Sequence, residues 1–307
     1  MADSKPRILR YGMAAVAEAA ARITAGEPVA VPTETVYGLA ADATNAQAVA
    51  RIYAAKGRPS FNPLIVHVAD LAAAEALAVF DADARLLAER FWPGPLTLVL
   101  PLRVGAPIAS LVTAGLTTVA LRVPRHRAMQ AVLAASGRPL AAPSANASNG
   151  ISPTRAEHVA ASLGTRIGLI LDDGATDAGL ESTILAGRTL LRPGPIGIGA
   201  LPWPVKRREE HATVTAPGQL KTHYAPTKPL RLNALAAEDD EWLIGFGAIR
   251  GNESLSTRGD VVEAAAGLFD ALHRADAGPA SRIAVAPIPS DGVGEAINDR
   301  LTRAAHR

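Results

Sequence analysis

The sequence has no cysteine, few aromatic residues (4%) and almost no excess of either charge. Without cysteine the chain can form no disulfide, thiolate nucleophile or cysteine-ligated zinc site. A formal net charge of +2 is too small to indicate a surface that coats nucleic acid, although it allows local basic patches around phosphate groups. The seven histidines form no HExxH or HxH cluster, so we expect no dedicated transition-metal site.

Long apolar runs are missing too. No stretch reaches the roughly 18 consecutive apolar residues that a membrane span requires, and the opening MADSKPRILRYG lacks the apolar core of a signal peptide. We therefore expect a cytoplasmic protein without membrane contact. The motifs GxxxxGK(S/T), GxGxxG and GxSxG are also absent, so the common phosphate-loop, dinucleotide and hydrolase templates do not apply.

The composition is that of a globular protein with a real core. Hydrophobic residues make up 49% of the 307 residues, which is long enough for one large domain or two. Alanine-rich helical patterns alternate with short β-branched runs such as LIVHV (64–68) and TVALRVP (118–124). This alternation predicts an α/β fold around a twisted, open sheet with mixed strand directions.

The character of the sequence changes between residues 202 and 229, which are polar and rich in proline and charge. Such a segment is typical of a linker between domains. After it, LRLNAL, WLIGFG and RIAVAPIP alternate with helical patterns and predict a smaller, Rossmann-like α/β unit. We predict a main domain over residues 1–205, a linker or lid over 206–229 and a small C-terminal domain over 230–307.

The segment KGRPSFNPL places Lys56 and Arg58 on either side of a glycine at the end of a predicted helix. An arginine fork and a compact lysine charge in this arrangement can hold a polyphosphate. The simpler explanation is a solvated helix end, where cations complement the helix dipole. Both interpretations fit these two residues taken alone.

A second candidate is APSANASNGISPT, residues 142–154. Ser144 and Asn146 can donate hydrogen bonds to phosphate oxygens, and the small neighbours let the backbone approach a ligand closely. Ser152 and Thr154 precede a predicted helix, whose free N–H groups attract anions. A serine-rich loop that caps a helix is the alternative.

The remaining candidates lie at strand ends. Arg122 sits in an apolar strand, so it needs a carboxylate or phosphate partner, and a structural salt bridge would serve. Arg192 leaves another strand in LRPG. Thr35, beside Glu34 in PTETVYGLA, suits recognition of a small polar ligand, although a capped turn explains it equally well. His67 alternates with two valines and either faces the same cleft or is an ordinary structural histidine.

Taken in order, these segments resemble a known family. The resemblance is to YrdC-like threonylcarbamoyl-AMP synthases, over about residues 8–200, and it rests on PTETVYGLA, KGRPSFNPLIVHV, FWPGPLTLVL, ALRVP, APSANASNGISPT, ESTIL and LRPGPI. APGQLKTHYAP and the small domain after it resemble the two-domain form. The resemblance implies that L-threonine, bicarbonate (or CO2) and ATP with Mg²⁺ give threonylcarbamoyl-AMP and pyrophosphate. Downstream transferase proteins would then modify tRNA with the threonylcarbamoyl group.

The resemblance also implies roles for residues. Lys56 and Arg58 would be the catalytic cations. The implied ATP contacts are Lys56, Arg58, Asn62, Thr118, Arg122, Ser144, Asn146, Ser152, Arg192 and Tyr224; the implied threonine contacts are Thr35, His67 and Ser182. No protein ligand for a metal is implied. Ala142 stands where some relatives have a threonine that touches the amino acid, and His223 with Tyr224 forms a candidate lid.

Two other functions fit parts of the sequence. One is an RNA- or tRNA-binding module, for which the cations would form a phosphate-tracking surface. Cations on separate strand ends converge on a pocket more naturally than on a flat stripe. The other is a carbamoyltransferase subunit like those of hydrogenase maturation proteins, but the cysteine-rich finger motifs of those proteins are absent. Whether the small domain contacts tRNA is left open by the sequence.

Overall fold

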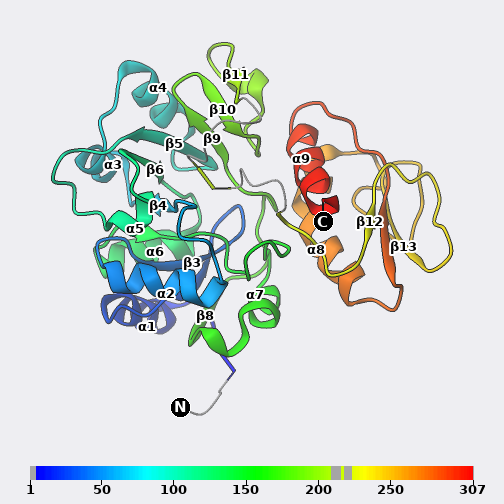
Figure 1. Ribbon diagram of the computed structural model, residues 1–307, viewed down its shortest axis with the longest axis horizontal. Coiled ribbons are helices and arrows are strands. Elements are labelled where there is room, and N and C mark those ends of the chain that lie inside the picture. Colours follow the sequence, from blue (N-terminus) through cyan, green and yellow to red (C-terminus); the bar gives the residue numbers. More distant parts are fainter. Residues whose placement is uncertain (1–4, 209–215, 218–222, 307) are drawn as a thin grey trace.

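The computed structural model describes residues 5–208, 216–217 and 223–306, which form two α/β units of unequal size (Figure 1). We call residues 5–208 the N-terminal unit and residues 230–306 the C-terminal unit. Each contains its own sheet, one large and mixed, the other small and parallel. This confirms the predicted fold class. None of the described helices has the length and apolar character needed to cross a membrane.

The large sheet runs in the order β1-β8-β2-β3-β7-β4-β6-β5-β9-β10-β11. Parallel and antiparallel pairs mix along it, for example β4 with β6 (parallel) and β5 with β6 (antiparallel). Its strands are β1 (Arg7–Arg10), β2 (Val29–Pro32), β3 (Tyr37–Asp42), β4 (Ile65–His67), β5 (Leu96–Pro101), β6 (Thr118–Arg122), β7 (Leu140–Ala141), β8 (Leu169–Asp172), β9 (Thr183–Ala186), β10 (Thr189–Arg192) and β11 (Lys206–Arg207).

Helices cover both faces of the central strands. Val29 and Val31 pack with α1 and α6, while Ala30 between them faces the cluster that includes α2, α3, α4, α5 and α7. The helices of this unit are α1 (Met13–Thr24), α2 (Ala46–Lys56), α3 (Leu71–Leu77), α4 (Ala82–Phe91), α5 (Ser110–Thr113), α6 (Arg127–Ser136) and α7 (Ala156–Leu163), with short 3₁₀ turns η1 (Gly164–Arg166) and η2 (Ile198–Ala200).

Local signals in the sequence set the ends of α2. The side chain of Asn45 accepts hydrogen bonds from the backbone N–H groups of Gln47 and Ala48, which have no partner within the helix. Gly57 ends the helix with φ 59°, a left-handed conformation that favours glycine. This turn fixes the positions of Lys56 and Arg58 on either side of it.

The C-terminal unit has four parallel strands in the order β12-β15-β13-β14, with helices α8 and α9. Its elements are β12 (Leu230–Arg231), β13 (Glu241–Gly245), β14 (Glu253–Ser254), α8 (Val261–Ala277), β15 (Arg282–Val285) and α9 (Gly294–Ala305). Its core also includes Val36, Ile151 and Leu180 of the N-terminal unit, so the two units share buried apolar surface. The boundary at residue 205 stays a prediction, and β11 continues the large sheet two residues past it.

Candidate functional site

A cavity opens where several loops and strand ends of the N-terminal unit meet residues of the predicted linker. The sheet brings these segments together, since β4 and β6 are parallel neighbours and their carboxyl ends lie at one edge. The residues that line the cavity are Thr33, Thr35, Val36, Gly38, Arg58, Ile65, His67, Arg122, Ala142, Pro143, Ser144, Glu181, Ser182, Arg192, Pro217, His223 and Tyr224.

Lys56 lies just behind this wall. Its Nζ donates to the backbone oxygens of Ser144 (2.6 Å) and Asn146 (2.5 Å), so it ties the end of α2 to the serine-rich loop. The ammonium group is buried without a carboxylate partner in the described part of the chain. Burial, and then the nearby cations Arg58 and Arg166, hold the pKa of Lys56 well below its usual value. An anion beside it would restore the charged form.

Arg58 forms part of the cavity wall. Its Nε donates to the backbone oxygen of Asn62 (3.2 Å) and its Nη2 to that of Pro63 (3.0 Å). Burial lowers the pKa of Arg58 to about 10, which leaves the guanidinium charged at neutral pH. Carbonyl groups orient this cation but do not neutralise it, so its positive charge remains available to a ligand.

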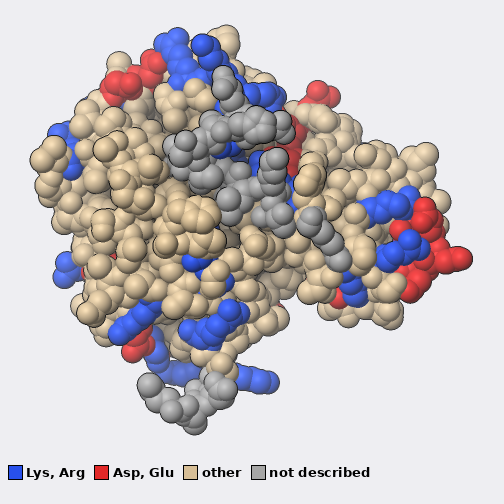
Figure 2. Space-filling view, in the orientation of Figure 1, with Lys and Arg blue, Asp and Glu red and all other residues tan. Residues whose placement is uncertain are grey.

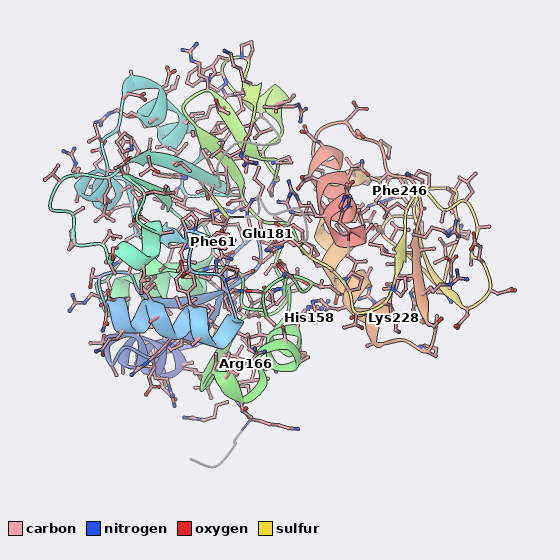
Figure 3. The ribbon with its side chains drawn as sticks, viewed as in Figure 1. Phe61, His158, Arg166, Glu181, Lys228 and Phe246 are labelled. Carbon is pink, nitrogen blue, oxygen red and sulfur yellow. The ribbon has the colours of Figure 1, made fainter. Side chains whose placement is uncertain are left out.

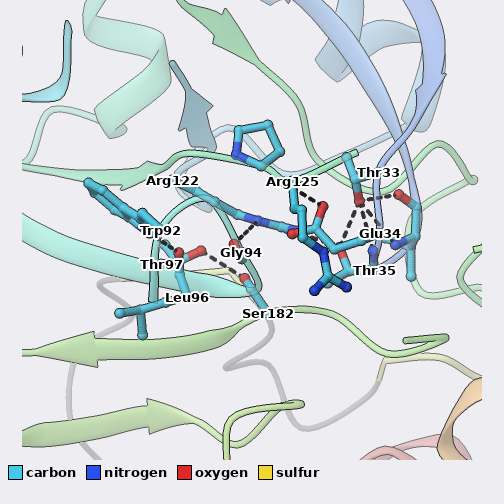
Figure 4. Close-up of polar contacts among 12 residues, drawn as sticks. Thr33, Glu34, Thr35, Trp92, Gly94, Leu96, Thr97, Arg122, Arg125 and Ser182 are labelled. Carbon is cyan, nitrogen blue, oxygen red and sulfur yellow. Dashed lines mark hydrogen bonds and ion pairs between the residues drawn. The ribbon is translucent and has the colours of Figure 1, made fainter. Parts of the chain in front are cut away.

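Arg122 has the carboxylate partner that its position in an apolar strand demands (Figure 4). Its Nη2 lies 2.8 Å from Glu34 Oε1 and its Nη1 donates to Thr35 Oγ1 (2.9 Å). Its Nε donates to the backbone oxygen of Gly94 (3.2 Å). Burial pushes the pKa of Glu34 upward, but the adjacent Arg122 holds it below its ordinary value. The pair is therefore ionised, and the Arg122 side chain holds the hydroxyl of Thr35 at the cavity wall.

Arg192 is fixed against Ser182. Its Nε and Nη2 donate to the backbone oxygen of Ser182 (3.1 and 2.9 Å), and Nη2 also reaches Ser182 Oγ (3.1 Å). Thr97 Oγ1 lies 2.7 Å from the same hydroxyl. The chain after Arg192 passes so close that a Cβ on Gly194 would lie 2.4 Å from the backbone nitrogen of Thr183. Only glycine fits at that point in LRPG.

Several buried polar atoms around the cavity have no hydrogen-bond partner among the described residues. They are Asn62 Oδ1, His67 Nδ1, Asn146 Oδ1, His223 Nδ1 and Tyr224 Oη. Buried polar atoms are nearly always paired, so a group of exceptions in one place indicates a site built for a ligand. Burial also holds the pKa of His67 and of His223 at about 3, which keeps both imidazoles neutral.

The linker contributes a buried tyrosine. Tyr224 is fully buried, stacks on Phe269 of α8 (ring centroids 5.6 Å apart) and has φ 68°, which is unusual for an aromatic residue. Its neighbour Ala225 donates from the backbone to Asn149 O (2.8 Å). Backbone strain of this kind persists only where the surroundings enforce it. Of the predicted linker, residues 209–215 and 218–222 lie outside the described residues.

The structure brings most of the predicted residues to one place. Those in the cavity wall are Thr35, Arg58, His67, Arg122, Ser144, Ser182, Arg192 and Tyr224. Lys56, Asn62, Asn146 and Ser152 are buried but do not line it. Thr118 begins β6 and Arg122 ends it, so Thr118 lies a strand length away and contributes nothing to the wall. The ligand contacts of all these residues remain predictions.

Two charged residues at the site were not predicted. Glu181 lines the cavity, and Arg300 of α9 donates to it from the C-terminal unit (Nε to Oε2, 2.8 Å). The sequence does contain a signal for Arg300. It belongs to the buried stripe of α9 with Ile297 and Leu301, where an unpartnered arginine would be costly. The partner, 119 residues away, is not visible in the sequence.

Comparison with known proteins decides the family. The Sua5/YciO/YrdC family, described as "Telomere recombination", matches residues 21–194, and the "Threonylcarbamoyl-AMP synthase, C-terminal domain" family matches residues 184–306. The chain is 43% identical to the threonylcarbamoyl-AMP synthase of Bacillus subtilis, over 94% of this chain and 92% of that one. The chain belongs to the threonylcarbamoyl-AMP synthase family. This confirms the resemblance drawn from the motifs, including the two-domain form.

Other members of the family agree over the same length. The threonylcarbamoyl-AMP synthase of Pyrococcus abyssi is 38% identical, over 94% of this chain and 93% of that one. The crystal structure of P. abyssi Sua5 complexed with L-threonine superposes with a TM-score of 0.88 at 36% identity, covering 97% of this chain and 96% of that one. The similarity therefore extends through both units.

Proposed function

We propose that this chain is a threonylcarbamoyl-AMP synthase that condenses L-threonine, bicarbonate or CO2, and ATP. The observation that carries the proposal is the cavity, where arginines from three separate segments, Arg58, Arg122 and Arg192, meet hydroxyl groups and unpartnered buried polar atoms. Family membership supports it, because relatives that match both units carry this name and one was solved with L-threonine.

The proposed reaction needs no covalent enzyme intermediate. The amine of threonine attacks CO2, forms a C–N bond and loses a proton to give a carbamate. A carbamate oxygen then attacks the α-phosphorus of ATP. The bond between that phosphorus and the oxygen that joins it to the β-phosphorus breaks. The products are threonylcarbamoyl-AMP and pyrophosphate. Catalysis of this kind depends on positioning and on neutralising phosphate charge.

We assign the phosphate end of the site to Lys56, Arg58 and Arg192. Arg58 and Arg192 line the cavity with no carboxylate within ion-pair distance in the described chain, so their charge can balance a triphosphate. Lys56 holds the backbone of Ser144 and Asn146 and gains its full charge when an anion approaches. Asn62, Ser144, Asn146 and Ser152 would complete the nucleotide contacts, with Thr118 the weakest assignment because it lies away from the cavity wall.

We assign the threonine end to Thr35, His67 and Ser182. Neutral His67 presents an unpartnered Nδ1, and the hydroxyls of Thr35 and Ser182 are fixed by the two arginines Arg122 and Arg192. Arg122 was assigned to ATP from the resemblance, but its hydrogen bond to Thr35 supports a position beside the proposed amino-acid end. We propose that it lies between the two substrates and attracts the carboxylate of threonine.

The linker residues His223 and Tyr224 complete the enclosure. Both are buried and line the cavity, and we propose that they keep water from the labile carbamate. Replacing Tyr224 with phenylalanine keeps the aromatic ring and removes only the hydroxyl, which has no partner among the described residues. If Tyr224→Phe leaves both the rate of synthesis and the lifetime of the product unchanged, the tyrosine hydroxyl has no part in the enclosure.

The magnesium ion would enter with the nucleotide. We propose that the nucleotide phosphates would carry this ion. We further propose a cytoplasmic location, transfer of the product to tRNA by separate transferase proteins, and domain limits at residues 1–205, 206–229 and 230–307.

The face of the molecule shown in Figure 2 does not favour the alternative of an RNA-binding module. On the face shown in Figure 2, the Lys and Arg side chains of the described residues occur in separate groups with acidic residues among them, without a continuous basic stripe. Proteins that track a phosphate backbone without sequence preference need such a stripe. A salt-sensitive gel shift with tRNA that ATP and threonine do not change would favour the RNA-binding alternative.

The reaction is tested by incubating the protein with ATP, ¹³C-bicarbonate and L-threonine and detecting the product by mass spectrometry. We expect an adenylate that contains one ¹³C atom and one threonine, with an equal amount of pyrophosphate. Omission of threonine should abolish the pyrophosphate. Replacement of ATP and bicarbonate by carbamoyl phosphate should give no product, whereas turnover with carbamoyl phosphate would identify a carbamoyltransferase instead.

A further inference from the structure

Arg300 reaches from the C-terminal unit into the wall of the cavity. It is the largest fully buried side chain among the described residues, although it carries a charge, and it lies on α9. Each of its three nitrogen positions has a partner: Nε donates to Glu181 Oε2 (2.8 Å), Nη1 to Asp299 Oδ2 (2.7 Å) and Nη2 to Pro193 O (3.0 Å). Its guanidinium carbon also lies 5.2 Å from the ring centroid of Tyr224.

Two of the residues that Arg300 contacts lie in the cavity wall, and a third lies next to it. Glu181 and Tyr224 line the cavity, and Pro193 follows Arg192, which lines it as well. The second carboxylate oxygen of Glu181 accepts from Ser152 Oγ at 2.5 Å. Figure 3 places Glu181 where the N-terminal unit approaches α9. A single arginine of the C-terminal unit therefore joins three segments around the cavity of the other unit.

Glu181 puts a negative charge in the cavity wall, and Arg300 forms an ion pair with it. A carboxylate in the wall of a cavity that binds a triphosphate would repel the ligand, more strongly where water is excluded. Burial alone would raise the pKa of Glu181, but Arg300 and then Arg192 hold that pKa below its usual value. The carboxylate is thus ionised and paired with Arg300, and the second carboxylate on Arg300, that of Asp299, is paired with Arg303 as well (Nε to Oδ1, 3.0 Å).

We propose that Arg300 is a positioning residue through which the C-terminal unit completes the nucleotide end of the cavity. It neutralises Glu181, and thereby leaves the charge of Arg192 to the phosphates, and it fixes Glu181 so that Ser152 is held in place. This inference rests on the proposed function for the identity of the ligand. It extends that function by giving the C-terminal unit a part in binding ATP.

The two units pack closely around Glu181 and Ser152. A Cβ on Gly179 would lie 2.4 Å from the backbone oxygens of Ala265 and Ala266 of α8, so the loop before Glu181 rests directly on that helix. His273 of α8 is also 3.2 Å from Ser152 O through its Nε2. The segment that contains Glu181 and the segment that contains Ser152 are therefore both supported by the C-terminal unit.

The test measures ATP binding by isothermal titration calorimetry in the full-length protein, without turnover. Arg300→Met keeps an unbranched apolar chain but removes the guanidinium group and leaves Glu181 unneutralised, so we expect Kd for ATP to rise at least tenfold. Adding Glu181→Gln to Arg300→Met removes the repulsive charge and should restore most of the affinity. Arg300→Lys, which keeps the charge, should lie between wild type and Arg300→Met.

The control is Arg231→Met. Arg231 pairs with the buried Glu241 in the C-terminal unit (Nη2 to Oε2, 2.6 Å). Arg231→Met therefore also leaves a buried carboxylate without this partner, but away from the cavity. It should lower stability and leave Kd for ATP unchanged. A merely structural role for Arg300 would give the same pattern, with less folded protein and unchanged affinity, and would overturn the proposal. So would additive effects of Arg300→Met and Glu181→Gln.

The outcomes separate this inference from the proposed function. If Arg300→Met does not fold, Arg300→Lys and the double variant with Glu181→Gln decide by the same measurement. Wild-type protein that binds ATP but makes no adenylate would reject the proposed reaction and leave the role of Arg300 standing. Wild-type affinity in Arg300→Met rejects only the role of Arg300. Absence of ATP binding to the wild type would overturn both.

Discussion

Replacement of Lys56 by methionine tests whether its charge serves the ligand or only the fold. Methionine keeps most of the length and removes the ammonium group, so the backbone oxygens of Ser144 and Asn146 lose their donor. Leaving such groups unsatisfied costs about 1–3 kcal/mol of stability each. Loss of a positive charge that the transition state uses lowers kcat by about 10²–10³-fold. We expect both effects from Lys56→Met.

Lys228 is the matched control, because its Nζ also donates to two backbone oxygens, those of Ala275 (3.1 Å) and Gly278 (2.6 Å). It lies in the C-terminal unit and does not line the cavity (Figure 3). Urea unfolding should show comparable losses of stability in Lys56→Met and Lys228→Met. Threonine-dependent release of pyrophosphate should fall by orders of magnitude only in Lys56→Met. Equal turnover in the two variants, at matched fractions of folded protein, would refute the assignment of Lys56 to the site.

Three further predictions follow from the same contacts. Thr35→Val removes the hydroxyl that Arg122 holds at the cavity wall. In a pyrophosphate assay it should raise KM for threonine about tenfold and leave KM for ATP the same. A rise in both constants would contradict the assignment of Thr35 to the threonine end. Burial holds the pKa of His67 at about 3, below its value of 6.5 when exposed, so the unfolded chain binds a proton first as the pH falls. The wild type should therefore lose about 2 kcal/mol more unfolding free energy than His67→Gln between pH 7 and pH 5, and equal losses in urea titrations would contradict the neutral state of His67. The charge of ATP should raise the lowered pKa of Lys56, so binding should be accompanied by proton uptake. Calorimetry in buffers of different ionisation enthalpy measures this uptake, and Lys56→Met should abolish it. The same uptake in that variant would assign the proton to another group.

Helices with local capping signals were predictable within a few residues. The helix end predicted at Lys56 and Gly57 is the observed end of α2 (Ala46–Lys56), because the left-handed glycine that ends the helix is a local signal. β3 (Tyr37–Asp42) was not predicted as a strand. Its sequence YGLAAD has few β-branched residues, and its conformation depends on pairing with β2 and β7 on either side.

The site was predictable as a set of segments but not as a network of contacts. Arg122 plainly needed a partner, yet only the fold identifies it as Glu34, 88 positions away in the sequence. The residues around Lys56 fitted either a phosphate-binding cation or a solvated helix end, whereas the structure buries Lys56 against the loop that contains Ser144. Such contacts depend on the order of strands in the sheet, and no local pattern encodes them.

The most direct test of the account is a crystal structure of the protein with L-threonine and a non-hydrolysable ATP analogue. We expect the triphosphate between Arg58 and Arg192, and threonine with its carboxylate toward Arg122 and its side chain near Thr35. Electron density for either ligand outside the cavity, with these arginines left facing only protein groups, would contradict the claim that this cavity brings the two substrates together.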